Sequence, residues 1–276
     1  MLDILFISII GLSILITSYT WNIWCNDQIF IDNDFDDNEF NNNDDEFIDC
    51  CSDDNNFNNI FTSSYNKEIK TPYVIGIAGG SGSGKTYIAN LIENTIKQTF
   101  PNSKCKDSVI ISQDSYYKGG DINTNYDIPE SIDFDLLINH INDLSNGLEI
   151  ECPIYDFTTH SRSNRTRKIK PTKIIIIEGI LIFVNEKLRD LMNIKVFIDA
   201  SGPTQVFRRL DRDMNERGRS LEEVKFRYIN HVEPSYRNYI IPSSRNADIT
   251  INNLDGFYVG PQILLSHIIE ILKHIC

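Results

Sequence analysis

Beyond about residue 69, short apolar runs alternate with longer stretches in which apolar residues recur at helical spacing. The runs are rich in isoleucine and valine, as expected for strands that are buried on both faces of a parallel sheet. Their alternation with amphipathic helices predicts an α/β fold whose open sheet is parallel in its core. The candidate strands are residues 73–78, 108–112, 173–178, 195–199 and 247–251.

Two of the intervening stretches have helical patterns. In residues 85–100, apolar side chains from Ile88 to Ile96 fall on one face. Residues 203–217 have a similar pattern but are rich in arginine. Because residues 69–276 are numerous enough to bury one hydrophobic core, we expect a single domain there.

The first 25 residues differ from the rest of the chain. Residues 4–24 are 21 positions without a charge, and as a helix they would span about 31 Å, enough for a bilayer core. Tyr19, Trp21 and Trp24 gather at one end, as interfacial aromatic residues do. The alternatives are a buried core helix and a cleaved signal peptide. Because no basic residue precedes the run and no clear cleavage site follows, we expect a transmembrane anchor over residues 1–25.

Residues 26–68 are rich in aspartate and asparagine, and the aromatic residues among them follow neither a strand nor a helix period. Twelve acidic and no basic residues lie between residues 27 and 66, so this segment carries nearly all of the net charge of −13. We expect a disordered linker, with an acidic docking tail or a cation-binding segment as the alternative. An acidic chain whose remainder is almost neutral argues against a nucleic-acid-binding surface.

The sequence GGSGSGKT, residues 79–86, follows the first candidate strand and fits the pattern G-x-x-x-x-G-K-[ST]. Backbone N–H groups of such a loop bind phosphates, its lysine bridges the outer phosphates, and its threonine hydroxyl binds Mg²⁺. A glycine-rich turn that matches by chance is the alternative, and the strand and helix on either side argue against it. The predicted ATP-binding residues of the loop are Gly79, Gly80, Ser81, Gly82, Ser83, Gly84, Lys85 and Thr86.

Two carboxylates stand at the carboxyl ends of candidate strands. Asp114 closely follows residues 108–112, and Glu178 ends residues 173–178. Ligands of open α/β sheets bind beyond this edge, so both carboxylates should face the phosphate loop. A helix N-cap or a solvent contact is the alternative for either residue taken alone.

Residues 207–223, FRRLDRDMNERGRSLEE, form an arginine-rich segment. Gly218 should end one helix, and Ser220 with Glu223 should form a capping box that begins the next. This pattern predicts a lid that brings arginines over phosphates. Solvated helix faces explain many arginine runs, and we assign Arg208 to that role. The candidate lid residues are Arg209, Arg212, Arg217 and Arg219.

The segment PIYDFTTHSR, residues 153–162, places Tyr155, Phe157 and His160 close together. Two rings and an imidazole would suit a nucleobase, which binds by stacking and by hydrogen bonds to its edge. Aromatic residues at a spacing of two are also common in cores, so this cluster alone leaves both interpretations open.

Taken together, residues 72 to 251 resemble the uridine-cytidine kinases, which transfer the γ-phosphoryl group of ATP to the 5′-hydroxyl of uridine or cytidine. The phosphate loop is shared by many NTPases, whereas the ordered set of motifs over about 180 residues is much more specific. The motifs are GIAGGSGSGKT, SQDSYY, NYDIPESIDFDLL, PIYDFTTHSR, IIEGIL, RRLDRDMNERGR and EPSYRNYIIPSSRNADITI.

The resemblance implies that Asp114 is the general base for the 5′-hydroxyl group. It also implies that Lys85 and Arg212 are catalytic and that Arg217 and Arg219 bind ATP phosphates. The remaining implied roles are Mg²⁺ binding by Thr86 and Glu178, ribose binding by Asp127 and Arg209, and pyrimidine binding by Tyr117, Tyr155, Phe157 and His160, with His160 at the 4-position.

The sequence departs from the family pattern in two places. The family usually has a glutamine in the ribose site where this chain has Arg227, which could donate to ribose oxygens or change the sugar preference. The family also rarely begins with a membrane segment and an acidic linker, so residues 1–68 gain nothing from the resemblance.

The combined expectation is a P-loop kinase domain over residues 69–276, with a mostly parallel five-stranded sheet, flanking helices and a β-hairpin. ATP and Mg²⁺ are the expected cofactors, and a homotetramer is typical of the family. The chain would be a single-pass membrane protein with a cytoplasmic kinase domain and no nucleic-acid partner. The alternatives are a phosphoribulokinase-like or ribosyl-nicotinamide kinase, and an inactive nucleotide-binding scaffold.

Overall fold

The computed structural model describes residues 72–275, apart from 104–105, 122 and 255–257. The predicted anchor (1–25) and the whole of the predicted linker (26–68) therefore lie outside the described residues. Within the described part of the chain, no helix is both long enough and apolar enough to cross a bilayer.

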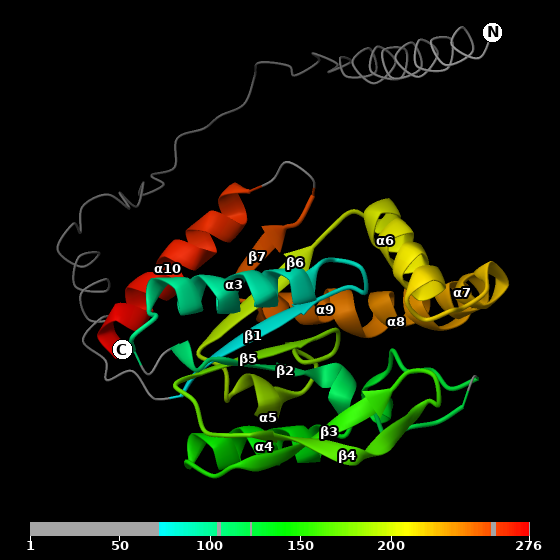
Figure 1. Cartoon of the computed structure of the whole chain (residues 1–276). Coiled ribbons are helices and arrows are strands. Elements are labelled where there is room, and N and C mark those ends of the chain that lie inside the picture. The colour runs from blue at the N-terminus through cyan, green and yellow to red at the C-terminus, as the bar shows by residue number, and fades with distance from the viewer. Residues whose placement is uncertain (1–71, 104–105, 122, 255–257, 276) are drawn as a thin grey trace, which may run out of the picture. The chain divides into compact units, whose positions relative to one another are not determined.

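The centre of the fold is a five-stranded sheet in the order β2-β5-β1-β6-β7, in which every neighbouring pair is parallel (Figure 1). All five candidate strands are confirmed. The central strand β1 lies between β5 and β6, where the order of connection reverses, and ligands of open α/β sheets bind at such a point. The strands are β1 (Tyr73–Gly79), β2 (Val109–Ser112), β5 (Ile174–Gly179), β6 (Ile194–Asp199) and β7 (Ile249–Asn252).

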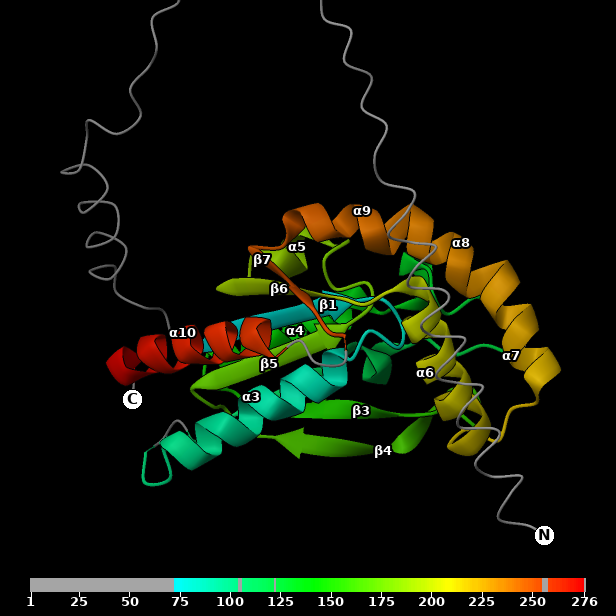
Figure 2. The same cartoon turned by 90° about the horizontal axis from the view of Figure 1, so that it is seen from above.

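Helices cover both faces of the sheet: α3 and α10 lie above it and α4 lies below it in Figure 1, and Figure 2, seen from above, has α3 and α10 in front of the strands. On one face α3 and α10 pack through residues such as Ile92 and Ile268 against Ile75 of β1. On the other face α4 packs through Ile141 in a core that includes Ile175 of β5. Because both faces are covered, the strand sequences are nearly continuous runs of apolar residues. The helices are α3 (Lys85–Thr99), α4 (Phe134–Ser145), α5 (Glu186–Arg189), α6 (Gly202–Asn215), α7 (Leu221–Arg227), α8 (Glu233–Ser235), α9 (Ile241–Ser243) and α10 (Val259–Ile275).

A β-hairpin of β3 (Ile150–Asp156) and β4 (Ser161–Ile169) forms a separate two-stranded antiparallel sheet. Its register shifts between Pro153 and Tyr155, a β-bulge that bends β3. Of the predicted aromatic cluster, Tyr155 lies in β3, and Phe157 and His160 lie in the turn of this hairpin. The expected β-hairpin is thus confirmed.

The chain from α7 to α9 is helical with two π-helical turns, Tyr228–Val232 and Tyr236–Ile240. Each π turn ends two residues before a proline, Pro234 or Pro242. A proline inside a helix removes one backbone hydrogen bond and clashes with the carbonyl four residues earlier, and a wider turn relieves both effects. This irregular helix lies behind the sheet in Figure 1 and approaches the carboxyl ends of the strands through α7.

Candidate active site

The phosphate loop joins β1 to α3 in a backbone conformation that requires glycine. Gly82 has φ +83° and Gly84 has φ +95°, both in the left-handed region. A Cβ atom on Gly82 would lie 2.4 Å from the carbonyl oxygen of Gln205, so no larger residue fits there. The Lys85 Nζ donates to the Gly80 carbonyl oxygen at 3.0 Å, which holds the ammonium group against the loop.

Two carboxylates lie at the carboxyl ends of the neighbouring strands, as predicted. Glu178 pairs in register with Ser112 of β2, whose hydroxyl donates to the Glu178 carboxylate. The Thr86 hydroxyl donates to the other carboxylate oxygen at 3.2 Å. Asp114 lies in the 3₁₀ turn directly after β2, and its backbone N–H donates to the Ser112 hydroxyl. Register and a local cap therefore fix both acids beside the phosphate loop.

Burial controls the electrostatics of this edge. Desolvation lowers the pKa of the Lys85 ammonium group, although Glu178 and Asp114 oppose the shift. Desolvation likewise raises the pKa of the Glu178 carboxyl, and the nearby Asp114 carboxylate adds to the increase. Lys85 is one cation beside two buried or partly buried acids, Asp114 and Glu178. A second cation at this edge would stabilise the charged forms of both acids.

The donor set suits Mg²⁺, a hard cation that prefers oxygen ligands and usually binds one or two carboxylates together with substrate phosphates and water. The Thr86 hydroxyl and the Glu178 carboxylate are such ligands. Among the described residues, no group of three or more His, Cys, Asp and Glu side chains could hold a metal ion. A cation here would therefore take most of its ligands from phosphate and water.

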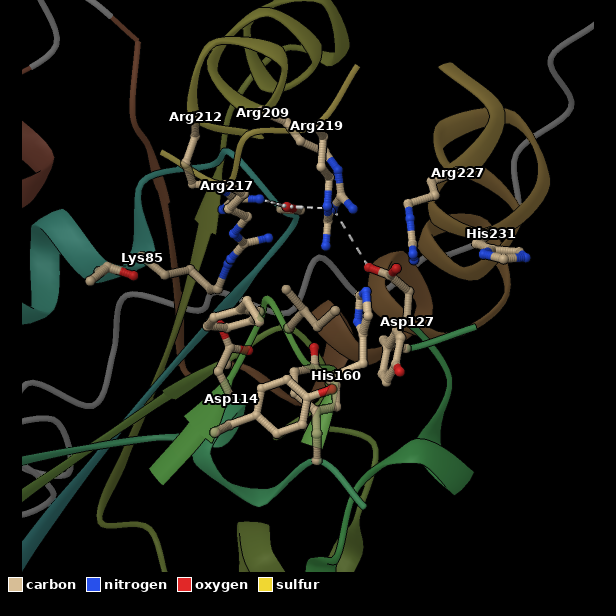
Figure 3. Close-up of a pocket in the computed structure, with 18 of the residues that line it drawn as sticks. Lys85, Asp114, Asp127, His160, Arg209, Arg212, Arg217, Arg219, Arg227 and His231 are labelled. Carbon is tan, nitrogen blue, oxygen red and sulfur yellow. Dashed lines mark hydrogen bonds and ion pairs between the residues drawn. The ribbon is translucent and has the colours of Figure 1, made fainter. Parts of the chain in front are cut away.

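The four predicted lid arginines gather above the phosphate loop (Figure 3). Arg209 donates to the Ser81 hydroxyl at 2.8 Å, and Arg212 reaches the same oxygen at 3.4 Å. The guanidinium carbon of Arg217 lies 4.2 Å from the centroid of the Phe157 ring, a cation–π contact between the lid and the hairpin. The arginines therefore connect the phosphate loop to the aromatic part of the site.

Aromatic rings form the opposite end of the site. The Tyr155 ring packs against Tyr117 and Phe157, with centroid distances of 5.2 and 5.3 Å. Tyr126 stacks on His160 at 5.6 Å with only 12° between the ring planes. His160 has φ +52° and is the one described residue other than glycine with a positive φ, a conformation in which histidine, asparagine and aspartate are enriched among non-glycine residues. The result is a wall of flat side chains.

Charged residues border this aromatic end. Arg209 pairs with Asp127 at 3.8 Å, and Arg227 donates to Glu223 at 3.0 Å. Desolvation lowers the pKa of His160, and Arg227 and Arg219 lower it further, so the neutral form of the imidazole is favoured. A neutral imidazole can both donate and accept a hydrogen bond, as recognition of a base edge requires.

Comparisons with known proteins agree with this geometry. The family model described as "Phosphoribulokinase / Uridine kinase family" matches residues 74–257. The chain is 41% identical to the uridine kinase of Bacillus subtilis over 211 residues, which cover 74% of this chain and 97% of that protein. It is 45% identical to the uridine kinase of Lactobacillus helveticus over 192 residues, covering 67% and 88%.

The chain belongs to the phosphoribulokinase/uridine kinase family. Its fold is also similar to the solved structure of the YGR205w protein, with a TM-score of 0.50 and 19% identity over 72% of this chain and 90% of that one.

As expected for this family, one pocket brings the predicted side chains together. Of the phosphate loop, Ser81, Lys85 and Thr86 line it, whereas the predicted residues Gly79, Gly80, Gly82, Ser83 and Gly84 do not. The other predicted residues that line it are Asp114, Tyr117, Asp127, Tyr155, Phe157, His160, Glu178, Arg209, Arg212, Arg217, Arg219 and Arg227.

Three further side chains of the pocket, Tyr126, Ile180 and His231, were missed by the sequence analysis. Tyr126 lies directly before Asp127, inside a motif already quoted for the family resemblance. His231 follows Arg227 by four residues, a helical spacing that places both on one side of the helix. Adjacency and helical spacing were therefore available signals for Tyr126 and His231.

The assignment of Arg208 to a solvated helix face is wrong. Its side chain is partly buried, and its Nη1 donates to the Asn253 carbonyl oxygen at 3.2 Å. A second cavity of about 400 Å³ lies here, beside the last glycine of the phosphate loop. It is lined by Gly84, Tyr87, Leu91, Arg208, Asn253, Leu254, Tyr258 and Pro261.

Proposed function

We propose that this protein is an ATP-dependent kinase that phosphorylates uridine and cytidine at the 5′-hydroxyl group, giving UMP and CMP. The observation that carries the proposal is a single pocket in which a phosphate loop and Asp114 meet a wall of aromatic rings and the His160 imidazole. Uridine kinases are also the curated relatives of the chain. Such a reaction would serve pyrimidine salvage.

Asp114 is the residue best placed to act as general base. Its carboxylate lines the pocket between the phosphate loop and the aromatic wall. It would accept the proton of the 5′-hydroxyl group as that oxygen forms a bond to the γ-phosphorus. The bond from the γ-phosphorus to the bridging oxygen breaks at the same time, and ADP leaves.

Cations on the other side of the pocket would stabilise the phosphoryl group in transit. Lys85 and the lid arginines Arg212, Arg217 and Arg219 would neutralise charge on the phosphate oxygens. Thr86 and Glu178 would hold Mg²⁺, which neutralises further phosphate charge when bound. The close packing of Lys85 and Arg212 on the loop orients these charges before the substrates arrive.

The aromatic end would bind the nucleoside. The Asp127 carboxylate accepts hydrogen bonds well and, with Arg209 beside it, would hold the ribose hydroxyls. The rings of Tyr117, Tyr155 and Phe157 would enclose the pyrimidine, and His160 would bind its 4-position. A neutral imidazole can accept from the amino group of cytosine or donate to the carbonyl group of uracil.

The second cavity would bind the adenine ring of ATP. It begins at Gly84, where the phosphate loop enters α3, so a nucleotide whose phosphates lie on the loop reaches it directly. The flat side chains of Tyr87 and Arg208 and the apolar Leu91 suit a purine.

The test is ADP release by the full chain with Mg-ATP and a panel of acceptors. Turnover of uridine and cytidine, without turnover of ribulose 5-phosphate or nicotinamide riboside, supports the proposal. Turnover of either other acceptor would favour a related kinase of this family. ATP binding without turnover of any acceptor would favour the inactive scaffold.

Two further parts of the proposal concern the whole protein. The uncharged residues 4–24 would anchor the chain in a membrane as a single pass, with the kinase domain in the cytoplasm, where ATP is available. Carbonate extraction of cell membranes tests this, because an anchored chain stays in the pellet.

The kinase domain would assemble as a homotetramer, and sedimentation in detergent gives the oligomeric state.

A further inference from the structure

Asp213 lies behind the pocket wall, and its carboxylate is surrounded by the four lid arginines. Its Oδ1 accepts from Arg212 at 3.0 Å and from Arg217 at 3.2 Å. Its Oδ2 accepts from Arg219 at 3.0 Å, and the Nε of Arg209 lies 3.5 Å from the same oxygen. The residue is fully buried, and it does not line the pocket itself.

This arrangement puts four positive charges around one negative charge. Guanidinium groups that share a carboxylate are close enough to repel one another, and the repulsion grows as water is excluded. Burial raises the pKa of the Asp213 carboxyl, but the fields of the four arginines outweigh burial and hold the pKa below its ordinary value. The carboxylate therefore stays charged and offsets the repulsion.

The same carboxylate joins two segments of the lid. Arg209 and Arg212 belong to α6, whereas Arg217 and Arg219 lie in the connection to α7. Gly218, between the latter two, has φ +64°, and this left-handed turn lets both flanking arginines reach Asp213. The Arg219 backbone N–H donates a hydrogen bond to the Asp213 carbonyl oxygen at 3.1 Å, and this bond closes the turn.

We propose that Asp213 is a positioning residue, which holds the lid arginines at the spacing that binds the outer phosphates of ATP. Each guanidinium group has five N–H donors, and Asp213 occupies only one side of each, so donors remain for phosphate oxygens. The role rests on the proposed function, since it assumes that the arginines bind ATP.

Glu223 extends the arrangement toward the aromatic end. Its Oε1 lies 3.5 Å from the Nε of Arg219 and accepts from Arg227 at 3.0 Å. Arg209 is less dependent on Asp213, because Ser81 and Asp127 contact it as well.

The test is Asp213→Asn in the full chain, with equilibrium binding of a non-hydrolysable ATP analogue and of AMP. We expect the affinity for the analogue to fall about 30-fold, since several charge-assisted hydrogen bonds are disrupted. The affinity for AMP, which lacks the outer phosphates, and the KM for uridine should change less than about threefold. Asp211→Asn is the matched control: Asp211 lies on the same helix, is exposed and accepts a hydrogen bond from the Asn215 amide, so the variant should leave both affinities unchanged.

A second variant covers the case in which Asp213→Asn does not fold. Gly218→Ala removes no charge, and a Cβ atom there meets nothing within 4 Å, but alanine disfavours the left-handed turn. It should weaken binding of the analogue about fivefold and leave AMP binding unchanged.

An analogue affinity within twofold of wild type in folded Asp213→Asn, or in Gly218→Ala if the first variant does not fold, would overturn the proposal. An equal loss of analogue and AMP affinity would also overturn it, because that result describes a general loss of structure. If wild type binds the analogue but phosphorylates no acceptor, the proposed function fails, while selective loss of analogue affinity still supports the role of Asp213.

Discussion

The phosphate end and the nucleoside end of the pocket are built in different ways. At the phosphate end, the loop after β1, Asp114 after β2 and Glu178 at the end of β5 all lie at the carboxyl edge of one parallel sheet. Strand register alone brings these three segments together. Their positions therefore follow from the order of the strands.

At the nucleoside end, the parts come from outside the sheet. Tyr126 lies in a loop before α4, His160 in the hairpin turn, and Arg227 at the end of α7. These segments are held by ring stacking and by ion pairs, such as that of Arg227 with Glu223. Side-chain contacts position the segments at this end, whereas backbone register positions those at the phosphate end. We therefore expect substitutions at the phosphate end to abolish catalysis or ATP binding, and those at the nucleoside end to change selectivity.

Asp114→Asn should give the largest effect. Loss of the general base should lower kcat about 10³-fold, while the affinity for ATP changes little, because Asp114 contributes no phosphate-binding donor. Single-turnover kinetics with uridine, combined with ATP binding, separates the two quantities. Asp107→Asn, an exposed position before β2, is the control. Full activity of Asp114→Asn would remove Asp114 from the reaction.

Gly82→Ala should break the phosphate end through its backbone. The new Cβ atom would meet the Gln205 carbonyl oxygen at 2.4 Å, and φ +83° is unfavourable for alanine. We expect the affinity for ATP to fall about 100-fold, because the loop N–H groups no longer converge on the phosphates. Gly202→Ala, where a Cβ atom has nothing within 4 Å, should bind ATP normally. Normal binding by both variants would show that the loop tolerates a side chain at residue 82.

The same difference between the two ends explains what the sequence could predict. The five strands, α3, α6 and the phosphate loop follow from local patterns, and the carboxyl-edge rule then places Asp114 and Glu178. The structure ends α3 at Thr99 and α6 at Asn215, one and two residues before the predicted ends. The Ser220 hydroxyl caps α7 as predicted, by accepting from the Glu223 N–H, whereas the Glu223 carboxylate of the predicted capping box pairs with Arg219 and Arg227.

The nucleoside end could not be derived from spacing in this way. Tyr155 and His160 were candidates from the sequence, but only the family resemblance distinguished a base pocket from an ordinary core. Tyr126 stacks on His160, whose backbone is left-handed, and no local pattern in the sequence indicates either feature. Arg208 was assigned to solvent because its partner, the Asn253 carbonyl group, is 45 residues away in the chain.

His160→Asn should change selectivity and leave ATP binding intact. Asparagine tolerates a positive φ better than alanine, so the variant removes the imidazole ring with little strain in the turn. We expect kcat/KM for uridine to fall about 30-fold through loss of the ring and its hydrogen bond. Thr159→Ala, an exposed neighbour in the same turn, is the control. A parallel fall in ATP affinity would contradict the separation of the two ends.

Arg227→Gln should have the smallest effect on activity. Its clearest effect should be on the protonation of His160. The pKa of His160 is lowered by burial first and by Arg227 and Arg219 next, so removal of the Arg227 cation should move the pKa upward, toward the ordinary value near 6.5. NMR titration of the His160 ring measures this directly, with Arg237→Gln, an exposed residue paired to Glu233, as the control. At pH 6 more of the imidazole would then be protonated, and uridine turnover relative to pH 7.5 should fall roughly twofold further than in wild type. An unchanged pKa would mean that the charge of Arg227 does not act on His160 in solution, and the nucleoside end would then be held by ring packing without this electrostatic contribution.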